Sequence, residues 1–279
     1  MTTTTFIDQL ARAERDHDSM LCVGLDPDPA RFPAPWRGDP ARIFDFCRAI
    51  VDATKDLVIA FKPQMAYFAA HRAEAQLEQL IVYIHDHAPN VPVILDAKRG
   101  DIGSTAEQYA REVFERYRAD AVTLSPFMGF DSIAPYLAYE GKGAILLCRT
   151  SNEGGADLQG QRLEGGELLY ERIARLASAA WNRGGQLGLV VGATYPAEIE
   201  RVRELAPTLP LLIPGIGAQG GDAAATVRAG WRHDGTRTTA PIIVSSSRAV
   251  LYASAGEDFT AAARAAAIAA RDQLNAARK

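Results

Sequence analysis

The sequence predicts an α/β fold in which eight strand–helix units close into a (β/α)8, or TIM, barrel. Short, continuously apolar runs recur along the chain with helical patterns between them, as expected for parallel strands buried on both faces. Charged and glycine-rich residues follow directly after these runs, where barrels of this class assemble their active sites. The length of 279 residues also fits one such barrel, which typically has about 250 residues.

Eight apolar runs are the expected strands, and each is short and without alternation. They are Leu21–Leu25, Leu57–Lys62, Val93–Asp96, Ala121–Leu124, Gly143–Cys148, Leu187–Val191, Leu211–Pro214 and Ile242–Ser245. An open, doubly wound sheet is the alternative, because strand order cannot be read from one sequence. Regular units without a linker between them favour the closed barrel, as a single domain over residues 1–279.

Helical patterns separate the expected strands. They are Pro40–Thr54, His71–Ala88, Ser104–Arg118, Asp131–Ala138, Glu167–Arg183, Pro196–Ala206 and Asp222–Ala229, with a closing alanine-rich helix over Asp258–Ala277. The segment 150–166, "TSNEGGADLQGQRLEGG", is polar and rich in glycine, which predicts a long mobile loop. Because long loops at the active face of a barrel often close over substrates, this one is a candidate lid.

Composition excludes several classes of protein. Hydrophobic residues make up 48% and charged residues 23%, as in ordinary globular proteins and unlike disordered chains. A net charge of −4 with mixed signs offers no basic face for nucleic acid. No apolar run is long enough to span a membrane, and the N-terminus lacks the pattern of a secretory signal. Cys22, Cys47 and Cys148 are too widely spaced for a disulfide framework, so we expect a cytoplasmic protein.

Charge is concentrated at the end of the third expected strand, in "VILDAKRGDIGS" (residues 93–104). Asp96 and Lys98 are two residues apart, so their side chains point to the same side if the strand continues through Lys98. A turn then precedes Asp101, and Ser104 is expected as the N-cap of the next helix. Taken alone, this motif could equally be a salt-bridged strand end followed by a capped helix.

A second lysine, Lys62, ends the preceding expected strand in "VIAFKPQMAYF". In a barrel that strand neighbours the third, so we expect the two lysines and the two aspartates to meet. Buried charges are costly unless each is paired, and clusters of this kind mark functional sites more often than structural ones. Asp26, in "CVGLDPD" after the first strand, could join the site or be only a turn residue before a proline.

The last two strand ends predict a phosphate site. A glycine-rich turn, Pro214 to Asp222, follows the seventh strand and opens a helix, and Arg248 follows the eighth strand. Backbone amides at a helix N-terminus bind phosphate, and an arginine adds a fork of donors. This position in the fold indicates a barrel of the phosphate-binding type. The five histidines show no ligand spacing, and His85-Asp86-His87 is expected on a solvated helix face, so no metal site is predicted.

Together these segments resemble one known family. "LDAKRGDIGST", with "GLDPD" and "FKPQMAYF" upstream and "TSNEGG" downstream, is similar to the orotidine 5′-phosphate decarboxylases, in their longer bacterial variety (type 2). The resemblance covers nearly the whole chain in strand order. It implies a cofactor-free barrel that removes CO₂ from orotidine 5′-monophosphate to give UMP, the last step of pyrimidine synthesis. It also implies a homodimer with shared active sites.

The resemblance further implies a role for each matched residue. Lys98 is the proton donor to C6 of the substrate, Asp96 lies beside the substrate carboxylate, and Lys62 bridges the charges. Asp101 with Ile102 reaches into the active site of a dimer partner. The implied substrate-binding residues are Asp26 at the ribose, Ser151 at the pyrimidine, and Gly217, Gln219 and Arg248 at the phosphate, together with Ile102, Thr105 and Pro214.

One position departs from the family pattern, and two other functions stay open. Shorter family members have a Gly-Arg pair at the last site, where this chain has Ser247-Arg248, so the local backbone contact is not defined. A related sugar-phosphate decarboxylase or epimerase could use the same scaffold and would recruit Mg²⁺. A non-catalytic nucleotide-binding barrel would need the charges only as a salt-bridged network.

Overall fold

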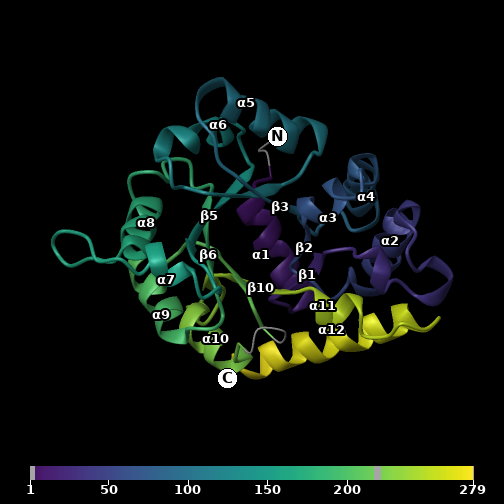
Figure 1. Cartoon of the computed structure of the whole chain (residues 1–279). Coiled ribbons are helices and arrows are strands. Elements are labelled where there is room, and N and C mark those ends of the chain that lie inside the picture. Colours follow the sequence, from purple (N-terminus) through teal and green to yellow (C-terminus); the bar gives the residue numbers. More distant parts are fainter. Residues whose placement is uncertain (1–3, 217–220, 279) are drawn as a thin grey trace.

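Eight parallel strands form a closed ring in the centre of the molecule (Figure 1). The computed structural model describes residues 4–216 and 221–278. The strands are β1 (Leu21–Leu25), β2 (Ala60–Pro63), β3 (Ile94–Arg99), β4 (Ala121–Leu124), β5 (Gly143–Arg149), β6 (Leu187–Val191), β7 (Leu211–Pro214) and β10 (Ile242–Ser246). They pair in the order β2-β1-β10-β7-β6-β5-β4-β3. Bridges from Phe61 to Val93 and from Gln64 to Asp96 join the two outer strands, which confirms the predicted barrel.

Helices surround this ring, and every predicted helix is present. They are α2 (Ile43–Thr54), α3 (Met65–Ala69), α4 (Glu74–His87), α5 (Gly103–Arg111), α6 (Ala134–Leu137), α7 (Gly155–Leu158), α8 (Leu169–Ser178), α9 (Pro196–Leu205), α10 (Ala223–Gly230), α11 (Arg248–Leu251) and α12 (Phe259–Ala276). Several are shorter than predicted. The prediction of Ser104 as an N-cap is wrong, because α5 already begins at Gly103 and Ile102 holds the cap position.

Some strand boundaries also differ from the prediction, by three residues at the start of β2 and at the end of β3 and by one residue elsewhere. β2 begins at Ala60 and not at Leu57, because the amide of Leu57 donates to the carbonyl of Thr54 at 2.9 Å in the turn that ends α2. β3 continues past Asp96 to Arg99, so the charged motif is itself part of the strand.

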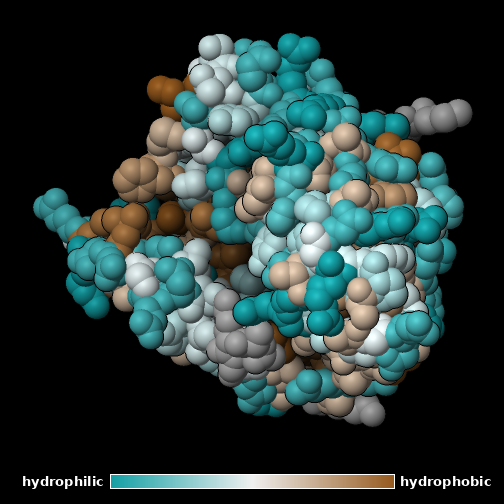
Figure 2. Space-filling view, turned by 45° about the vertical axis from the view of Figure 1, so that its right-hand side comes forward, coloured by the Kyte–Doolittle hydropathy of each residue, from teal (hydrophilic) through white to brown (hydrophobic). Residues whose placement is uncertain are grey.

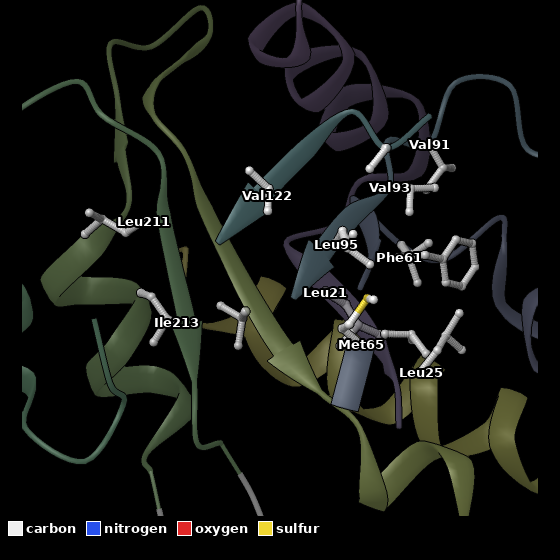
Figure 3. Close-up of a cluster of buried hydrophobic side chains, with 14 of the residues drawn as sticks. Leu21, Leu25, Phe61, Met65, Val91, Val93, Leu95, Val122, Leu211 and Ile213 are labelled. Carbon is white, nitrogen blue, oxygen red and sulfur yellow. The ribbon is translucent and has the colours of Figure 1, made fainter. Parts of the chain in front are cut away.

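Alternate residues of each strand face opposite sides of the sheet. Outward-facing residues pack beneath the helices, and Figure 3 shows Leu21, Leu95, Val122 and Ile213 in this large apolar core. Inward-facing residues form a second cluster inside the barrel: Cys22, Ala60, Ile94, Ala121, Ile145, Val190, Leu212 and Ile243. The barrel is therefore filled by side chains at this level.

An N-terminal helix, α1 (Phe6–His17), precedes the predicted pattern and closes the barrel at the end where the strands begin. The Thr5 hydroxyl accepts from the amide of Asp8, and the Asp8 carboxylate accepts from the amide of Thr5, each at 3.1 Å, which forms a capping box. Phe6 and Leu10 are buried and pack into the inward cluster. Figure 1 shows α1 in the middle of the ring of strands.

A hairpin of β8 (Arg232–His233) and β9 (Thr238–Ala240) also lies outside the predicted pattern. Trp231 Nε1 and Thr238 Oγ1 donate to the buried carboxylate of Glu14 on α1, at 3.0 and 2.9 Å. A groove of about 970 Å³ lies between this hairpin and α1. None of the predicted site residues that the structure describes lines the groove, so it is separate from this part of the predicted active site.

The predicted alanine-rich helix, α12, is 18 residues long and packs against the barrel. Its Ala263 and Ala267 are buried and belong to the large apolar core, which explains their small side chains. Within residues 4–216 and 221–278, no helix combines the length and the apolar character needed to cross a bilayer.

Candidate active site

Charged residues of β2 and β3 meet at the end of the barrel where the strands finish. Lys62 Nζ lies 2.9 Å from Asp96 Oδ2, and Lys98 Nζ lies 2.6 Å from Asp96 Oδ1. Asp96 is therefore held between two ammonium groups, in an alternating row of charges that we call the charge row. Lys62 and Asp96 are buried, whereas the Lys98 side chain is 46% exposed. Lys98 is thus the end of the charge row that a bound molecule can reach.

The members of the charge row keep one another ionised. Burial alone would raise the pKa of the Asp96 carboxyl, but the charges and hydrogen bonds of Lys62 and Lys98 outweigh it and lower this pKa well below its ordinary value. Burial alone would lower the pKa of the Lys62 ammonium, but the charges of Asp96 and Asp26 raise it above its ordinary value. Both groups therefore carry their charges at neutral pH.

Thr123 on β4 completes this arrangement, and the sequence analysis did not select it. Its hydroxyl donates to Asp96 Oδ1 at 2.8 Å. The same hydroxyl accepts from the amides of Ala97 and Lys98, at 3.1 and 3.0 Å. Gln64 Nε2 donates to Asp96 Oδ2 at 3.1 Å, so four side chains hold this carboxylate. A threonine inside an apolar run gives no signal of its role in the sequence.

The backbone kinks at Lys98, whose φ of 46° lies in the left-handed region that non-glycine residues rarely adopt. Such a conformation costs about 1–3 kcal/mol and persists only where its surroundings hold it. Thr123 holds the amide here, and the pairing of β3 with β4 shifts between Leu95 and Arg99. The strand thus continues through Lys98, but with a bulge, so simple alternation is not what brings Lys98 to Asp96.

Asp101 and Ile102 do not join the charge row within one subunit. Among the described residues, the one hydrogen bond to the Asp101 side chain comes from the amide of Ile102, at 2.9 Å. Within one subunit, Asp101 therefore does not join the two lysines and Asp96. Ile102 is 52% exposed, and Phe127, in the turn after β4, is 75% exposed. Figure 2 shows hydrophobic side chains gathered along one side of a hollow in the molecular surface.

Asp26 follows β1 and lies close enough to raise the pKa of Lys62. Its Oδ1 is buried and has no hydrogen-bond partner among residues 4–216 and 221–278. The Tyr252 hydroxyl donates to the carbonyl of Asp26 at 2.8 Å and accepts from the amide of Asp28 at 2.7 Å, which fixes this loop. A buried carboxylate oxygen of this kind is suited to accept a hydrogen bond from a ligand hydroxyl.

The predicted phosphate site is described only in part, because Gly217 and Gln219 lie outside the described residues. Pro214 ends β7 and pairs with Ser245 of the neighbouring β10. Arg248 begins α11 directly after β10 and is exposed. These residues therefore follow adjacent strands at the same end of the barrel, while their contact with phosphate stays a prediction. Thr105, in the first turn of α5, is also exposed.

The predicted lid, residues 150–166, contains the short helix α7 and a hydrogen-bonded base. The amide of Thr150 donates to Gln159 Oε1 at 2.8 Å, and Gln159 Nε2 donates to Thr150 Oγ1 at 2.9 Å. Ser151 packs against Gly192. A Cβ atom added to residue 192 would lie only 2.6 Å from the Cβ of Ser151, so no residue larger than glycine fits at position 192. Figure 1 shows the chain between α7 and α8 extending away from the barrel. Its mobility stays a prediction.

The expectation that His85-Asp86-His87 is only a solvated face is wrong for His85. Its Nε2 atom lies 3.0 Å from Oδ2 of the buried Asp120, and Lys142 Nζ lies 3.2 Å from Oδ1. Asp120 directly precedes β4, so this cluster is at the opposite end of the barrel from the charge row. In the described part of the chain, no three His, Cys, Asp or Glu side chains gather as possible metal ligands.

Comparison with known proteins decides the family. The model of the "Orotidine 5'-phosphate decarboxylase / HUMPS family" matches residues 19–266, which is most of the chain. The chain belongs to this family. The orotidine 5′-phosphate decarboxylase of Leptothrix cholodnii is 74% identical over 276 residues, and the match covers 98% of this chain and 97% of that protein.

Solved structures of orotidine 5′-phosphate decarboxylases have the same barrel. The Leishmania donovani OMP decarboxylase is 38% identical with a TM-score of 0.85, and the match covers 99% of both chains. The Leishmania donovani UMP synthase is also 38% identical, with a TM-score of 0.84, and the match covers 98% of this chain and 57% of that longer chain. Membership of the longer bacterial variety stays a prediction.

Proposed function

We propose that this orotidine 5′-phosphate decarboxylase family member converts orotidine 5′-monophosphate to UMP and CO₂, the last step of pyrimidine synthesis. The reaction is that of a carboxy-lyase. The observation that carries the proposal is the charge row, in which the exposed Lys98 ammonium lies 2.6 Å from the buried Asp96 carboxylate. This row lies at the mouth of a barrel whose relatives are named for the reaction.

The chemical difficulty is an electron pair left on carbon. The bond from C6 to the substrate carboxylate breaks, CO₂ leaves, and the electron pair stays on C6 in an sp² orbital that the ring does not delocalise. The Lys98 ammonium stabilises this charge, and its Nζ proton then moves to C6 to give UMP. The neutral amine regains a proton from solvent. Enzymes lower barriers by about 8–23 kcal/mol, and fixed charges are usually the largest contribution.

Asp96 has two parts in this proposal. It pairs with Lys98 and Lys62, and so orients the proton donor. Its negative charge also lies beside the substrate carboxylate, which favours the departure of CO₂. We rank stabilisation of the charge on C6 first, because destabilisation of the bound substrate is the weaker physical argument.

The remaining site residues bind the parts of the nucleotide that do not react. Asp26 accepts hydrogen bonds from the ribose hydroxyls, and Ser151 contacts the pyrimidine. The phosphate is bound by Gly217, Gln219 and Arg248, with Ile102, Thr105 and Pro214 as further contacts. The chain is a single barrel domain over residues 1–279. Binding of the phosphate closes the lid of this domain, residues 150–166, over the nucleotide. Binding energy far from the reacting bond is thereby used for catalysis.

We also propose a cytoplasmic homodimer whose subunits share active sites. Asp101 and Ile102 do not reach the charge row of their own subunit, and Ile102, Phe127 and Met128 are each exposed large hydrophobic side chains. A second copy that covers these residues would bring its own Asp101 to the charge row. Burial of such side chains is a common feature of subunit interfaces. The cysteines are buried and unpaired, which suits a reducing compartment.

Ultraviolet absorbance of orotidine 5′-monophosphate tests this function. Purified protein is mixed with the substrate in the presence of EDTA, and the expected result is rapid loss of the orotate band. A sugar-phosphate decarboxylase or epimerase would leave the band unchanged and act on sugar phosphates only after Mg²⁺ is added. A non-catalytic barrel would bind the nucleotide without turnover. Either of these outcomes would contradict the proposal.

A further inference from the structure

Arg99 follows the kinked Lys98 in β3. It contacts β4 through its backbone and the end of α5 through its side chain. Its carbonyl accepts from the amide of Ser125 at 2.8 Å, which resumes pairing with β4 after the bulge. Thr123 holds the chain on the other side of the kink through the amide of Lys98. The backbone of Lys98 is therefore fixed from both directions.

The side chain of Arg99 reaches across to the end of α5. Its Nε and Nη2 atoms donate to the Glu112 carboxylate at 3.1 and 2.9 Å, as a two-pronged ion pair. Its guanidinium lies 4.6 Å from the centre of the Tyr109 ring. Glu112 begins a π-helical turn, Glu112–Arg116, that continues α5. π-Helical turns are rare and occur frequently at functional sites.

Arg99 and Glu112 lie on either side, in the sequence, of the predicted site residues that follow Lys98. Arg99 and Glu112 are the ends of a segment that carries Asp101, Ile102 and Thr105. Their pairing closes this segment into a loop that is anchored at one end next to Lys98. Both side chains are partly exposed, at 23% and 21%. Ion pairs with this exposure contribute little to stability, so a fixed geometry is the larger effect to expect.

We infer that Arg99 is a positioning residue, which through Glu112 holds the Lys98 ammonium and the Asp101 turn in their reactive arrangement. The inference rests on the function proposed above. Arg99 itself touches neither Asp96 nor the exposed end of the charge row. Loss of the pair should therefore lower kcat more than it weakens substrate binding, because small misplacements of a reacting group cost rate more than affinity.

Steady-state kinetics of Arg99→Ala test the inference. We expect kcat to fall about 10- to 100-fold with KM within about threefold of the wild-type value. Guanidinium ion at tens of millimolar should restore part of kcat, because Glu112 and the Tyr109 ring remain to bind it. Arg99→Lys should recover less than the full rate, since an ammonium cannot make the two-pronged contact. If Arg99 had a purely structural role, guanidinium would not restore kcat, and Arg99→Ala would not change kcat without also changing KM.

Two further variants keep the test decisive. Arg264→Ala removes another two-pronged ion pair, to Asp56 at 2.7 Å, far from the charge row on α12, and should leave kcat unchanged. If Arg99→Ala does not fold, kcat of Glu112→Gln is measured in its place, and the same fall in kcat is expected. A kcat within twofold of wild type, or a loss confined to KM, would overturn the inference alone. Absence of turnover by the wild-type protein would refute the proposed function and this inference with it.

Discussion

Thr123 shows how one hydroxyl defines the geometry of the charge row. It contacts the carboxylate of Asp96 and the amides of Ala97 and Lys98, one of which belongs to the left-handed residue. These contacts lie on one side of the carboxylate, and the ammonium of Lys62 lies on the other. The orientation of Asp96 therefore depends on a residue that carries no charge.

Replacement of Thr123 by valine should separate this orientation from simple packing. Thr123→Val keeps the shape but leaves two backbone amides without their acceptor, so we expect kcat to fall about 10- to 100-fold. Thr123→Ser retains the hydroxyl and should recover most of the rate. Measurement of kcat for both variants, with thermal unfolding as a check on folding, tests the prediction. Equal kcat for Thr123→Val and the wild type would contradict it.

At the scale of single residues, the sequence predicts the charges but not their support. Lys62, Asp96 and Lys98 stand out because each is a charge at the end of an apolar run. Thr123 does not stand out, since its role comes from the pairing of β3 with β4. The position of Asp101 relative to the charge row could not be predicted from the sequence either, because within one subunit its side chain is bonded to the amide of Ile102 and not to the charge row.

At the scale of elements, α1 supplies the floor beneath the active site. Leu10 is fully buried and packs with the inward residues of the strands. Leu10→Ala should therefore lower the free energy of unfolding by about 2–5 kcal/mol, as expected for a cavity in a core. Arg15→Ala, on the exposed face of the same helix, should change it by less than about 0.5 kcal/mol. Denaturant unfolding measures both, and equal stability of the two variants would contradict this role of α1.

A second cluster at the strand starts makes stability depend on pH. Burial alone would raise the pKa of Asp120, but the hydrogen bond with His85, the charge of Lys142 and the amide of Val93 lower it below its ordinary value of 3.8. A carboxyl whose pKa is lower in the folded state stabilises the fold above its ordinary pKa. This contribution is lost as the pH falls below that value.

Asp120→Asn removes this titration. We expect the variant to be less stable than wild type by about 3 kcal/mol at neutral pH, because His85 and Lys142 lose a buried partner. The difference should shrink as the pH is lowered below about 4, since the carboxyl is protonated first in the unfolded chain and only at lower pH in the folded protein. Unfolding at several pH values measures the difference. A difference that does not change with pH would contradict the assigned role of Asp120.

The sequence predicts the repeating elements because each buried parallel strand is a continuous apolar run. It does not predict α1, which precedes the first strand, or the hairpin of β8 and β9, whose strands are only two and three residues long. The helix boundaries also shift where a turn competes with the helix. Ser104, for example, is not the N-cap of α5, because the helix already begins at Gly103, whose φ is +54°.

At the scale of the whole molecule, the two ends of the barrel have different tasks. Packing of α1 and the Asp120 cluster stabilise the end where the strands begin. In the proposed function, the charge row and the loops after the strands carry the chemistry at the other end, as is usual for this architecture. Ile102 and Phe127 are exposed after the strands at that end, and the proposed homodimer would cover them.

Mixed dimers test whether the subunits share active sites. Lys98→Ala and Asp101→Ala should each be inactive as homodimers. In a mixed dimer, the Asp101→Ala subunit retains its own Lys98 and receives an intact Asp101 from its partner, so one site of two is complete. Random reassembly of equal amounts should restore about one quarter of the wild-type activity, by counting pairings in a two-fold dimer. No recovery would show that Lys98 and Asp101 act within one subunit.

The central claim is that the Lys98 ammonium stabilises and protonates C6, and single-turnover decay of the orotidine 5′-monophosphate absorbance tests it most directly. Wild-type protein, Lys98→Ala and a control, Lys55→Ala, are each mixed in excess with substrate. Among the described residues, Lys55 pairs only with the exposed Asp52, so its loss should not change the rate. The account predicts that Lys98→Ala slows decay by at least about 10³-fold while UMP still binds. Decay by Lys98→Ala at a rate close to wild type would contradict it.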